Sequence, residues 1–136
     1  KHFDGKAWNR WDEEIKLRKS AALKHYSEIL RDEIFFHKFL QFVFFKQWNK
    51  IHDYCLSRNI KIIGDIPIYV AFDSADAWSH PEYFLFDEEN NPTFVAGVPP
   101  DEFSPTGQLW GNPLYNWKKH QENNFSWWVK RFRKTL

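Results

Sequence analysis

Apolar positions recur every three or four residues between Ser20 and Arg58, which is the periodicity of an α-helix. Residues 35–48 are apolar on nearly every side, and a helix of this kind must be buried on several sides. The segment therefore predicts a central packing helix of a larger α/β domain. A membrane-surface helix fits less well, because the segment lacks a strongly basic face. Asp32 is predicted as an N-cap for the second part, and Asn59 as the left-handed residue that ends it.

A β-branched run follows this helix and ends at a glycine, an aspartate and a proline, in Lys61-Ile-Ile-Gly-Asp-Ile-Pro67. This pattern is typical of a buried parallel strand that stops near Asp65. Residues 84–86 and 93–95 flank the acidic stretch 87–92, which predicts a short antiparallel hairpin. The acidic stretch lacks the ligand spacing of a calcium loop, so we interpret it as a solvated turn. Residues 117–136 predict a further helix with one apolar face, formed by Phe125, Trp128, Val129 and Phe132.

Residues 97–113, called the flap below, contain four prolines and three glycines, so neither helix nor strand is expected to persist there. Loops of this length in a compact domain are usually lids or binding loops. The flap presents aromatic rings beside Asp101, Gln108 and Asn112. Pyranose rings stack on aromatic side chains, while their hydroxyls need such polar partners, so this composition indicates sugar binding. The alternative is a rigid loop that is packed for stability alone.

Composition narrows the function classes. The chain has 19 Lys and Arg against 18 Asp and Glu, a formal net charge of +1. It therefore lacks the general positive electrostatic potential that would attract the phosphates of a nucleic acid. No apolar run is long enough for a membrane span. The single cysteine, Cys55, excludes a disulfide framework and fits a reducing compartment, so we expect a cytoplasmic protein. Methionine is absent, even at position 1, which leads us to expect a piece of a larger protein.

Several kinds of catalytic or metal chemistry find no support. Phosphate-binding glycine motifs and a Gly-x-Ser-x-Gly elbow are missing, and no two histidines stand four residues apart, as a helical metal site requires. Candidate carboxylates are Asp65, Asp73, Asp76 and Asp101. The sequence alone does not establish which two of them, if any, lie at the separation that glycosidic chemistry needs. Asp65 is either a functional group at the strand end or a loop cap.

Several blocks together resemble the 4-α-glucanotransferase family, also called amylomaltase or disproportionating enzyme. The blocks are Ile63-Gly-Asp-Ile-Pro-Ile-Tyr-Val-Ala71, Asp73-Ser-Ala-Asp76 with Trp78, Val95-Ala-Gly-Val-Pro-Pro-Asp101, Phe103-Ser104, Thr106-Gly-Gln108 and Trp110-Gly-Asn-Pro-Leu-Tyr115. Gln47-Trp48 and Trp127-Trp128 with Arg131 match in the same order, so nearly the whole chain is covered. The flap block, residues 97–113, is highly specific to this family.

The resemblance implies an α/β fold: a partial (β/α)₈ TIM barrel segment with a long helix, a barrel strand at 60–66, a small hairpin and a lid-loop insertion. It implies that Asp65, at the end of that strand, contacts donor sugar. It implies that Asp101, Phe103 and Trp110 line or cover the glucan path and keep water out. We predict six substrate-binding residues: Asp65, Asp101, Phe103, Gln108, Trp110 and Asn112. For the parent protein the resemblance implies a retaining glycosyltransferase that transfers α-1,4-glucan between maltooligosaccharides, with no metal or organic cofactor.

The chain also departs from the family pattern. The nucleophile motif Arg-Ile-Asp-His-Phe-Arg-Gly is not found, nor are the acid/base Glu and the third Asp, so no catalytic residue is assigned. Glu102 and Phe125 stand where the family usually has Tyr. We therefore interpret residues 1–136 as an internal fragment of the catalytic domain, inactive by itself. The alternatives are a non-catalytic maltooligosaccharide-binding fragment and a structural fragment that self-associates.

Overall fold

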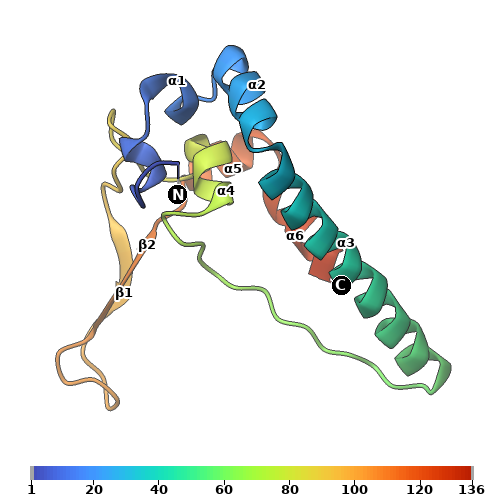
Figure 1. The fold of residues 1–136 in the computed structure, drawn as a ribbon. Helices are drawn as coiled ribbons and strands as arrows, with labels where there is room; N and C mark the ends of the chain where they lie inside the picture. The colour runs from blue at the N-terminus through green and yellow to red at the C-terminus, as the bar shows by residue number, and fades with distance from the viewer. Residues whose placement is uncertain (1, 136) are drawn as a thin grey trace. The chain divides into compact units, whose positions relative to one another are not determined.

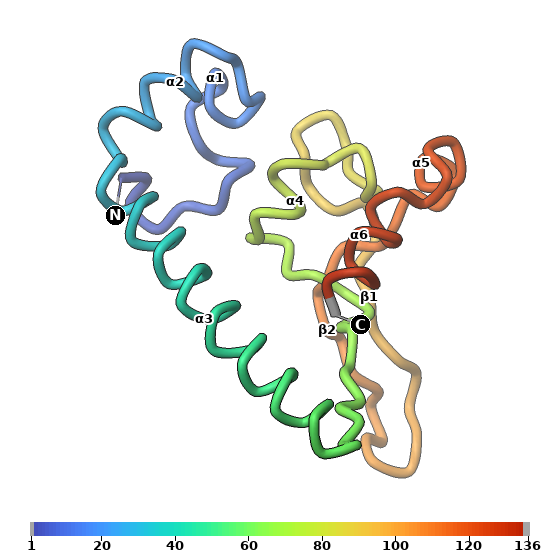
Figure 2. The backbone as a smooth tube through the Cα atoms, turned by 90° about the vertical axis from the view of Figure 1, so that its right-hand side faces the viewer, coloured from blue at the N-terminus to red at the C-terminus, as the bar shows by residue number. Residues whose placement is uncertain are grey.

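The computed structural model describes residues 2–135. Contacts divide the chain into two compact units. The first unit comprises residues 2–16 and 66–135, and the second comprises residues 17–65. Each unit is described by itself (Figures 1 and 2).

Two helices make up most of the second unit, α2 at Ser20–Ile29 and α3 at Arg31–Ser57. The predicted helical stretch is confirmed, and Figure 2 shows the backbone passing from α2 into α3 with little interruption. The prediction of Asp32 as an N-cap is wrong. Leu30 is the N-cap residue, and it keeps its amide bonded to the Tyr26 carbonyl while its own carbonyl accepts from Ile34. Because hydrogen bonding runs across the junction, no side-chain cap is needed there, and Asp32 lies in the first turn of α3.

The end of α3 follows the sequence prediction. Asn59 adopts a left-handed conformation with φ 56°. Its amide donates to the Leu56 carbonyl at 3.1 Å, and the Ile60 amide donates to the Cys55 carbonyl at 2.9 Å. This pair of bonds is a Schellman motif, which satisfies carbonyls that the last turn would leave unpaired.

Helix α3 carries its apolar side chains into solvent, and none of its residues is buried in the described structure. The rings of Phe35, Phe42 and Phe44 are 69%, 61% and 58% exposed. The sequence predicts that this helix needs cover on several sides. The described residues do not provide that cover.

The predicted barrel strand at 60–66 is not formed. These residues have neither helix nor strand geometry, and Ile63 is 94% exposed. A parallel strand takes its hydrogen bonds from neighbouring strands, and the described residues contain a single sheet, which has two antiparallel strands elsewhere in the chain. The segment therefore has the composition of a buried strand, but the described residues provide no neighbouring strand with which it could pair.

The sheet of the first unit corrects the prediction for the flap. Strand β1 (Val95–Val98) pairs antiparallel with β2 (Gln108–Pro113), so strands do persist at both ends of the flap. In Figure 1 they run side by side as a ribbon. Three of the four prolines lie in the connecting turn and the fourth ends β2, so none interrupts the ladder. The register shifts between Val95 and Gly97, where β2 carries extra residues.

The hairpin predicted from residues 84–86 and 93–95 is reduced to a single bridge between Phe86 and Pro92. Proline has no amide to donate, and Val95 is taken into β1, so a longer ladder cannot form. Phe84 instead bridges to Tyr115. The turn itself agrees with the prediction, since the exposed Asp87 carboxylate accepts from the amides of Glu89 and Asn91. These bonds lower the pKa of Asp87.

The helix predicted over 117–136 is broken in two. Helix α5 spans Trp117–Glu122 and α6 spans Ser126–Thr135, separated by Asn124 and Phe125 with φ 55° and 53°. The predicted apolar face is also wrong in part. Trp127 is the buried residue of α6, at 6% exposed, whereas Phe125, Val129 and Phe132 are 40% or more exposed.

Aromatic residues from distant parts of the chain form the core of the first unit. Its buried members are Trp8, Ala77, Phe84, Tyr115 and Trp127. Trp8, Ala77 and Trp127 lie in η1 (Trp8–Arg10), α4 (Ala75–Ser79) and α6, whereas Phe84 follows η2 (Pro81–Tyr83) and Tyr115 lies between β2 and α5. Helix α1 (Glu13–Lys16) buries Ile15 outside this cluster. No helix in the described part of the chain is long and apolar enough to cross a membrane.

Candidate functional site

Two glycines allow the flap to close as a hairpin. A Cβ on Gly97 would lie 2.6 Å from the carbonyl oxygen of Gln108 across the ladder. At Gly107, φ is +74° and a Cβ would lie 2.6 Å from the Val98 carbonyl oxygen. Only glycine fits both places without moving backbone. The flap is therefore a defined hairpin rather than an irregular loop.

The turn of the flap holds two of the predicted site residues, Asp101 and Phe103. The Asp101 carboxylate accepts through Oδ1 from the amides of Phe103 and Ser104, at 3.0 and 2.8 Å. The Ser104 hydroxyl donates to the Gly107 carbonyl at 2.8 Å. One carboxylate oxygen is thus used within the turn. The Phe103 ring, 82% exposed, is free to meet a ligand face.

Strand β2 holds three more predicted site residues, Gln108, Trp110 and Asn112. The Trp110 indole nitrogen donates to Oε1 of Gln108 at 3.0 Å. Nδ2 of Asn112 donates to the Val70 carbonyl at 2.9 Å. The structure therefore places Gln108 and Trp110 in direct contact and joins Asn112 to the segment around Val70. The Trp110 ring remains 48% exposed.

Sequence reasoning gives no role to Tyr69, which the structure places at this site. Its ring lies 6.1 Å from the Trp110 ring in an edge-on arrangement, and 6.2 Å from the Tyr115 ring with the planes 8° apart. An aromatic residue four positions after Asp65, inside a block that resembles the family, is the signal that could have identified it. Tyr69 and Trp110 together form an aromatic corner beside the Gln108 amide.

Asp65 belongs to the other unit, residues 17–65, where its side chain is exposed. It ends a stretch of that unit, residues 60–65, which has neither helix nor strand geometry. Of the six predicted residues, the structure brings Gln108 and Trp110 together on β2, joins Asp101 to Phe103 in the turn, and attaches Asn112 to Val70.

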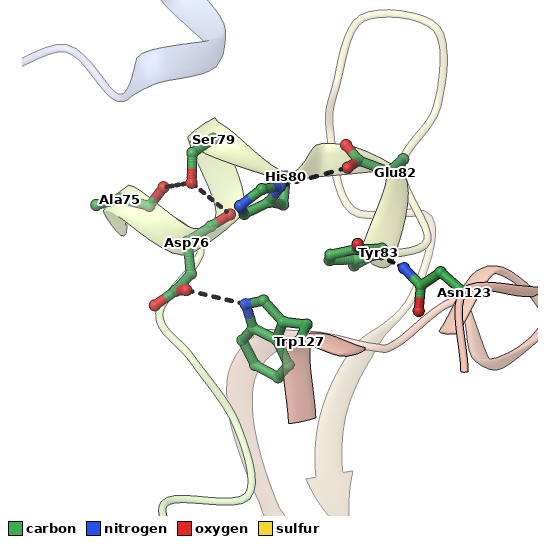
Figure 3. Close-up of polar contacts among 8 residues, drawn as sticks. All are labelled: Ala75, Asp76, Ser79, His80, Glu82, Tyr83, Asn123 and Trp127. Carbon is green, nitrogen blue, oxygen red and sulfur yellow. Dashed lines mark hydrogen bonds and ion pairs between the residues drawn. The ribbon is translucent and has the colours of Figure 1, made fainter. Parts of the chain in front are cut away.

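The other two candidate carboxylates serve the fold. Asp76 accepts from the indole nitrogen of Trp127 at 3.1 Å, which ties α4 to α6 (Figure 3). Oδ1 of Asp73 accepts from the Trp8 amide at 3.3 Å. Each carboxylate thus meets an N–H of a buried tryptophan, an arrangement expected of structural residues.

Burial shifts the pKa of two side chains next to the candidate site. It raises the pKa of the Tyr115 phenol, with the nearby Arg131 partly offsetting the rise, so the hydroxyl stays a donor. His120 is fully buried among aromatic rings, 4.7 Å from the Tyr83 ring, and burial lowers its pKa. Within residues 2–135, no group of three or more His, Cys, Asp and Glu side chains is arranged to hold a metal ion.

Comparison with known proteins decides the family. The family model described as 4-alpha-glucanotransferase matches residues 1–136. The chain belongs to this family. It is 52% identical over 136 residues to a 4-alpha-glucanotransferase of Aquifex aeolicus and 50% identical over 135 residues to one of Clostridium butyricum. These alignments cover 100% and 98% of the chain but 28% of each relative. The chain therefore spans just over a quarter of the length of these glucanotransferases.

A solved structure of a family enzyme agrees. The amylomaltase from Streptococcus agalactiae in complex with acarbose matches 98% of the chain and 27% of its own length, with 45% identity and a TM-score of 0.90. The mixed helix and strand structure described above is thus shared with part of a larger glucanotransferase. The resemblance inferred from the sequence blocks is confirmed at the level of the family.

Proposed function

We propose that this chain supplies part of the glucan-binding surface of a 4-alpha-glucanotransferase, through the flap and Asp65. The observation that carries the proposal is the pair formed by Trp110 and Gln108: a half-exposed indole ring hydrogen-bonded to an amide on the same strand. The acarbose complex of the related amylomaltase supports a sugar ligand for this surface.

The chemistry of the pair suits a pyranose. The exposed Trp110 ring offers a flat face for the C–H groups of a sugar. Gln108 uses its oxygen to accept from the indole, which leaves its amide nitrogen to donate to a hydroxyl. Tyr69 supports the indole from the side, so the ring is held in place before a sugar arrives.

The turn of the flap has a second role in this proposal. Phe103 covers the bound glucan with an apolar face, and Asp101 offers its remaining carboxylate oxygen to a sugar hydroxyl. Transfer to a sugar hydroxyl must outcompete hydrolysis of the glycosyl-enzyme intermediate, so a cover that excludes water favours transfer. Glu102 places a charge in the same turn, where the family usually has Tyr.

In the complete enzyme we infer that residues 60–66 form a barrel strand, with Asp65 at its carboxyl end against the donor sugar. The β-branched composition and exposure of this segment support that inference, because it lacks only strand neighbours. The nucleophile and the general acid/base lie outside residues 1–136 in this proposal, so the isolated chain binds glucan but does not transfer it. Its free cysteine is consistent with the cytoplasm.

A chimera tests the proposal. This chain replaces the matching 28% of the Aquifex aeolicus glucanotransferase, to which it aligns over its whole length. We expect maltotriose disproportionation by the chimera, no product from the isolated chain, and a loss of about tenfold in kcat/KM for Trp110→Ala. Trp117→Ala is the matched control, since Trp117 is 55% exposed and lies outside the flap. If the chimera is active and Trp110→Ala lowers kcat/KM no more than Trp117→Ala does, the proposal is contradicted.

A second candidate concerns the isolated chain. We propose that it self-associates through α3, so that a second copy covers the exposed phenylalanines. From Ile34 to Phe45 the only Lys, Arg, Asp or Glu is Lys38, so little charge opposes pairing. Light scattering should show concentration-dependent dimers, and Phe42→Glu should shift them to monomer. If the isolated chain is a monomer at all concentrations, this proposal is rejected. If the isolated chain dimerises and the chimera is monomeric, the rest of the enzyme covers the exposed phenylalanines of α3 in the complete protein.

A further inference from the structure

The main chain of residues 67–72 is held by side chains. The segment is neither helix nor strand, yet four of its carbonyl oxygens accept hydrogen bonds from four distant side chains. Nη2 of Arg131 donates to Pro67 at 3.0 Å, the hydroxyl of Tyr115 to Ile68 at 2.7 Å, Nδ2 of Asn112 to Val70 at 2.9 Å, and Nε1 of Trp8 to Phe72 at 2.8 Å. These bonds take the place of a strand ladder.

Three of the four donors are held by their surroundings. Tyr115 and Trp8 are 4% and 1% exposed within the aromatic core. The Arg131 guanidinium lies 4.5 Å from the Trp127 ring centre and 5.2 Å from that of Trp128, which fixes it by cation–π contact. A carbonyl bonded to a fixed donor is itself fixed. The four bonds therefore act as a clamp on the segment.

The clamp connects two parts of the proposed site. Asn112 lies in β2, the strand that carries Gln108 and Trp110, and Tyr115 follows that strand by two residues. At the other end, Pro67 comes two residues after Asp65 in the chain. Residues 67–70 are thus fastened to the flap strand on one side and joined covalently to Asp65 on the other.

We propose that Asn112 and Tyr115 are positioning residues, which couple the flap to the segment that follows Asp65. This inference rests on the proposed function and replaces the prediction that Asn112 contacts sugar, since its amide nitrogen is used on Val70. Glucan that binds on Trp110 and Gln108 contacts the strand whose Asn112 holds the Val70 carbonyl, and Tyr115, just after that strand, holds the Ile68 carbonyl. The flap strand and residues 67–70 are therefore held in one arrangement, as a near-attack geometry requires of the groups it positions.

The first test is independent of glucan. Asn112→Asp removes the amide donor and Tyr115→Phe removes the hydroxyl, with little change of shape. The controls are Asn116→Asp, which keeps the N-cap acceptor of α5, and Tyr83→Phe, which loses a hydroxyl contact to Asn123 away from the clamp. Backbone ¹⁵N relaxation of the isolated chain should show increased motion at 66–72 in the two clamp variants only. If relaxation at 66–72 is unchanged in Asn112→Asp and Tyr115→Phe, these side chains do not hold the segment and the clamp is rejected.

The second test uses the chimera. We expect the clamp variants to lower kcat by about tenfold and to change KM by less than about twofold, because a displaced strand end harms the reacting geometry more than sugar contact. Tyr83→Phe should leave both constants within about twofold. An active chimera whose kcat is unaffected by the clamp variants overturns the positioning role. An inactive chimera overturns the proposed function, while the relaxation result still decides whether the clamp exists.

Discussion

The indole nitrogen of Trp110 donates to the side-chain oxygen of Gln108 at 3.0 Å, two residues apart on the same strand. The bond does two things at once. It orients the exposed indole ring, and it fixes which end of the Gln108 amide faces outward. A surface arranged before its ligand arrives loses less side-chain freedom on binding.

This arrangement separates the two functions of Gln108 by mutation. Gln108→Glu keeps an oxygen for the indole but removes the outward N–H donors, whereas Gln108→Leu removes both. We expect Gln108→Glu to weaken maltooligosaccharide binding by about three- to tenfold, as for one lost hydrogen bond, and Gln108→Leu to weaken it further. Calorimetric titration measures both affinities. If both variants bind maltooligosaccharide as tightly as the unmodified chain does, Gln108 does not contact the sugar.

Gly97 should control the closure of the flap. In Gly97→Ala the new methyl group meets the Gln108 carbonyl oxygen at 2.6 Å, so β1 and β2 must move apart. We expect faster amide hydrogen exchange throughout β1 and β2 and weaker glucan binding. Gly5→Ala is the control, because Gly5 has φ +71° with no atom near its Cβ position. It should cost about 1 kcal/mol in stability without altering exchange in the flap. Normal exchange in Gly97→Ala contradicts the described register.

Trp127 should be the residue of α6 on which stability most depends. It is 6% exposed and donates to Asp76 at 3.1 Å (Figure 3). Trp127→Ala should lower the free energy of unfolding by about 3–5 kcal/mol, and Trp127→Phe by less, since most of the ring volume is kept. Urea unfolding measures both, and Trp117→Ala at an exposed position should cost under about 1 kcal/mol. Equal effects at positions 117 and 127 would reject this core assignment.

His120 should make stability depend on pH. Burial lowers its pKa in the folded chain below the ordinary value of 6.5 that it regains on unfolding. Between these two values the unfolded chain binds more protons, so stability is fully present above pH 6.5 and is lost as the pH falls toward the folded pKa. Unfolding at about pH 7.5 and pH 5.5 should show this loss, and His120→Gln should reduce its size. An identical pH dependence in the variant contradicts the assignment.

Some features of the secondary structure follow from local sequence alone. Others depend on contacts with residues that are distant in the chain. The end of α3 at Asn59 depends on one residue that tolerates a left-handed conformation, so the sequence is sufficient. The segment 60–66 has the composition of a strand but needs neighbours that residues 2–135 do not supply. The number of prolines in the flap predicts that no strand persists there, but their positions matter more than their number. Their positions in the turn and at the end of β2 leave the ladder intact.

The candidate site shows the same division. Trp110 and Gln108 could be selected by residue type, because stacking rings and amides are what sugars require. The bond from Asn112 to Val70 could not be foreseen, since it joins residues 42 positions apart. Tyr69 was missed for the same reason, as its contact with Trp110 exists only in the folded unit. Residue types indicate which chemistry a site can perform. Contacts between distant parts of the chain determine which of those side chains remain free to bind a ligand.

Titration of the ¹⁵N-labelled chain with acarbose shows whether Trp110 and Gln108 bind sugar, with the indole N–H signal of Trp110 as the readout. We predict that this signal and the side-chain amide of Gln108 shift progressively, while the indole signal of Trp117 stays in place. The shifts should disappear in the matched titration of Trp110→Ala. An unmoved Trp110 signal at saturating acarbose, or shifts confined to residues outside the flap, would rule out a glucan-binding role for Trp110 and Gln108.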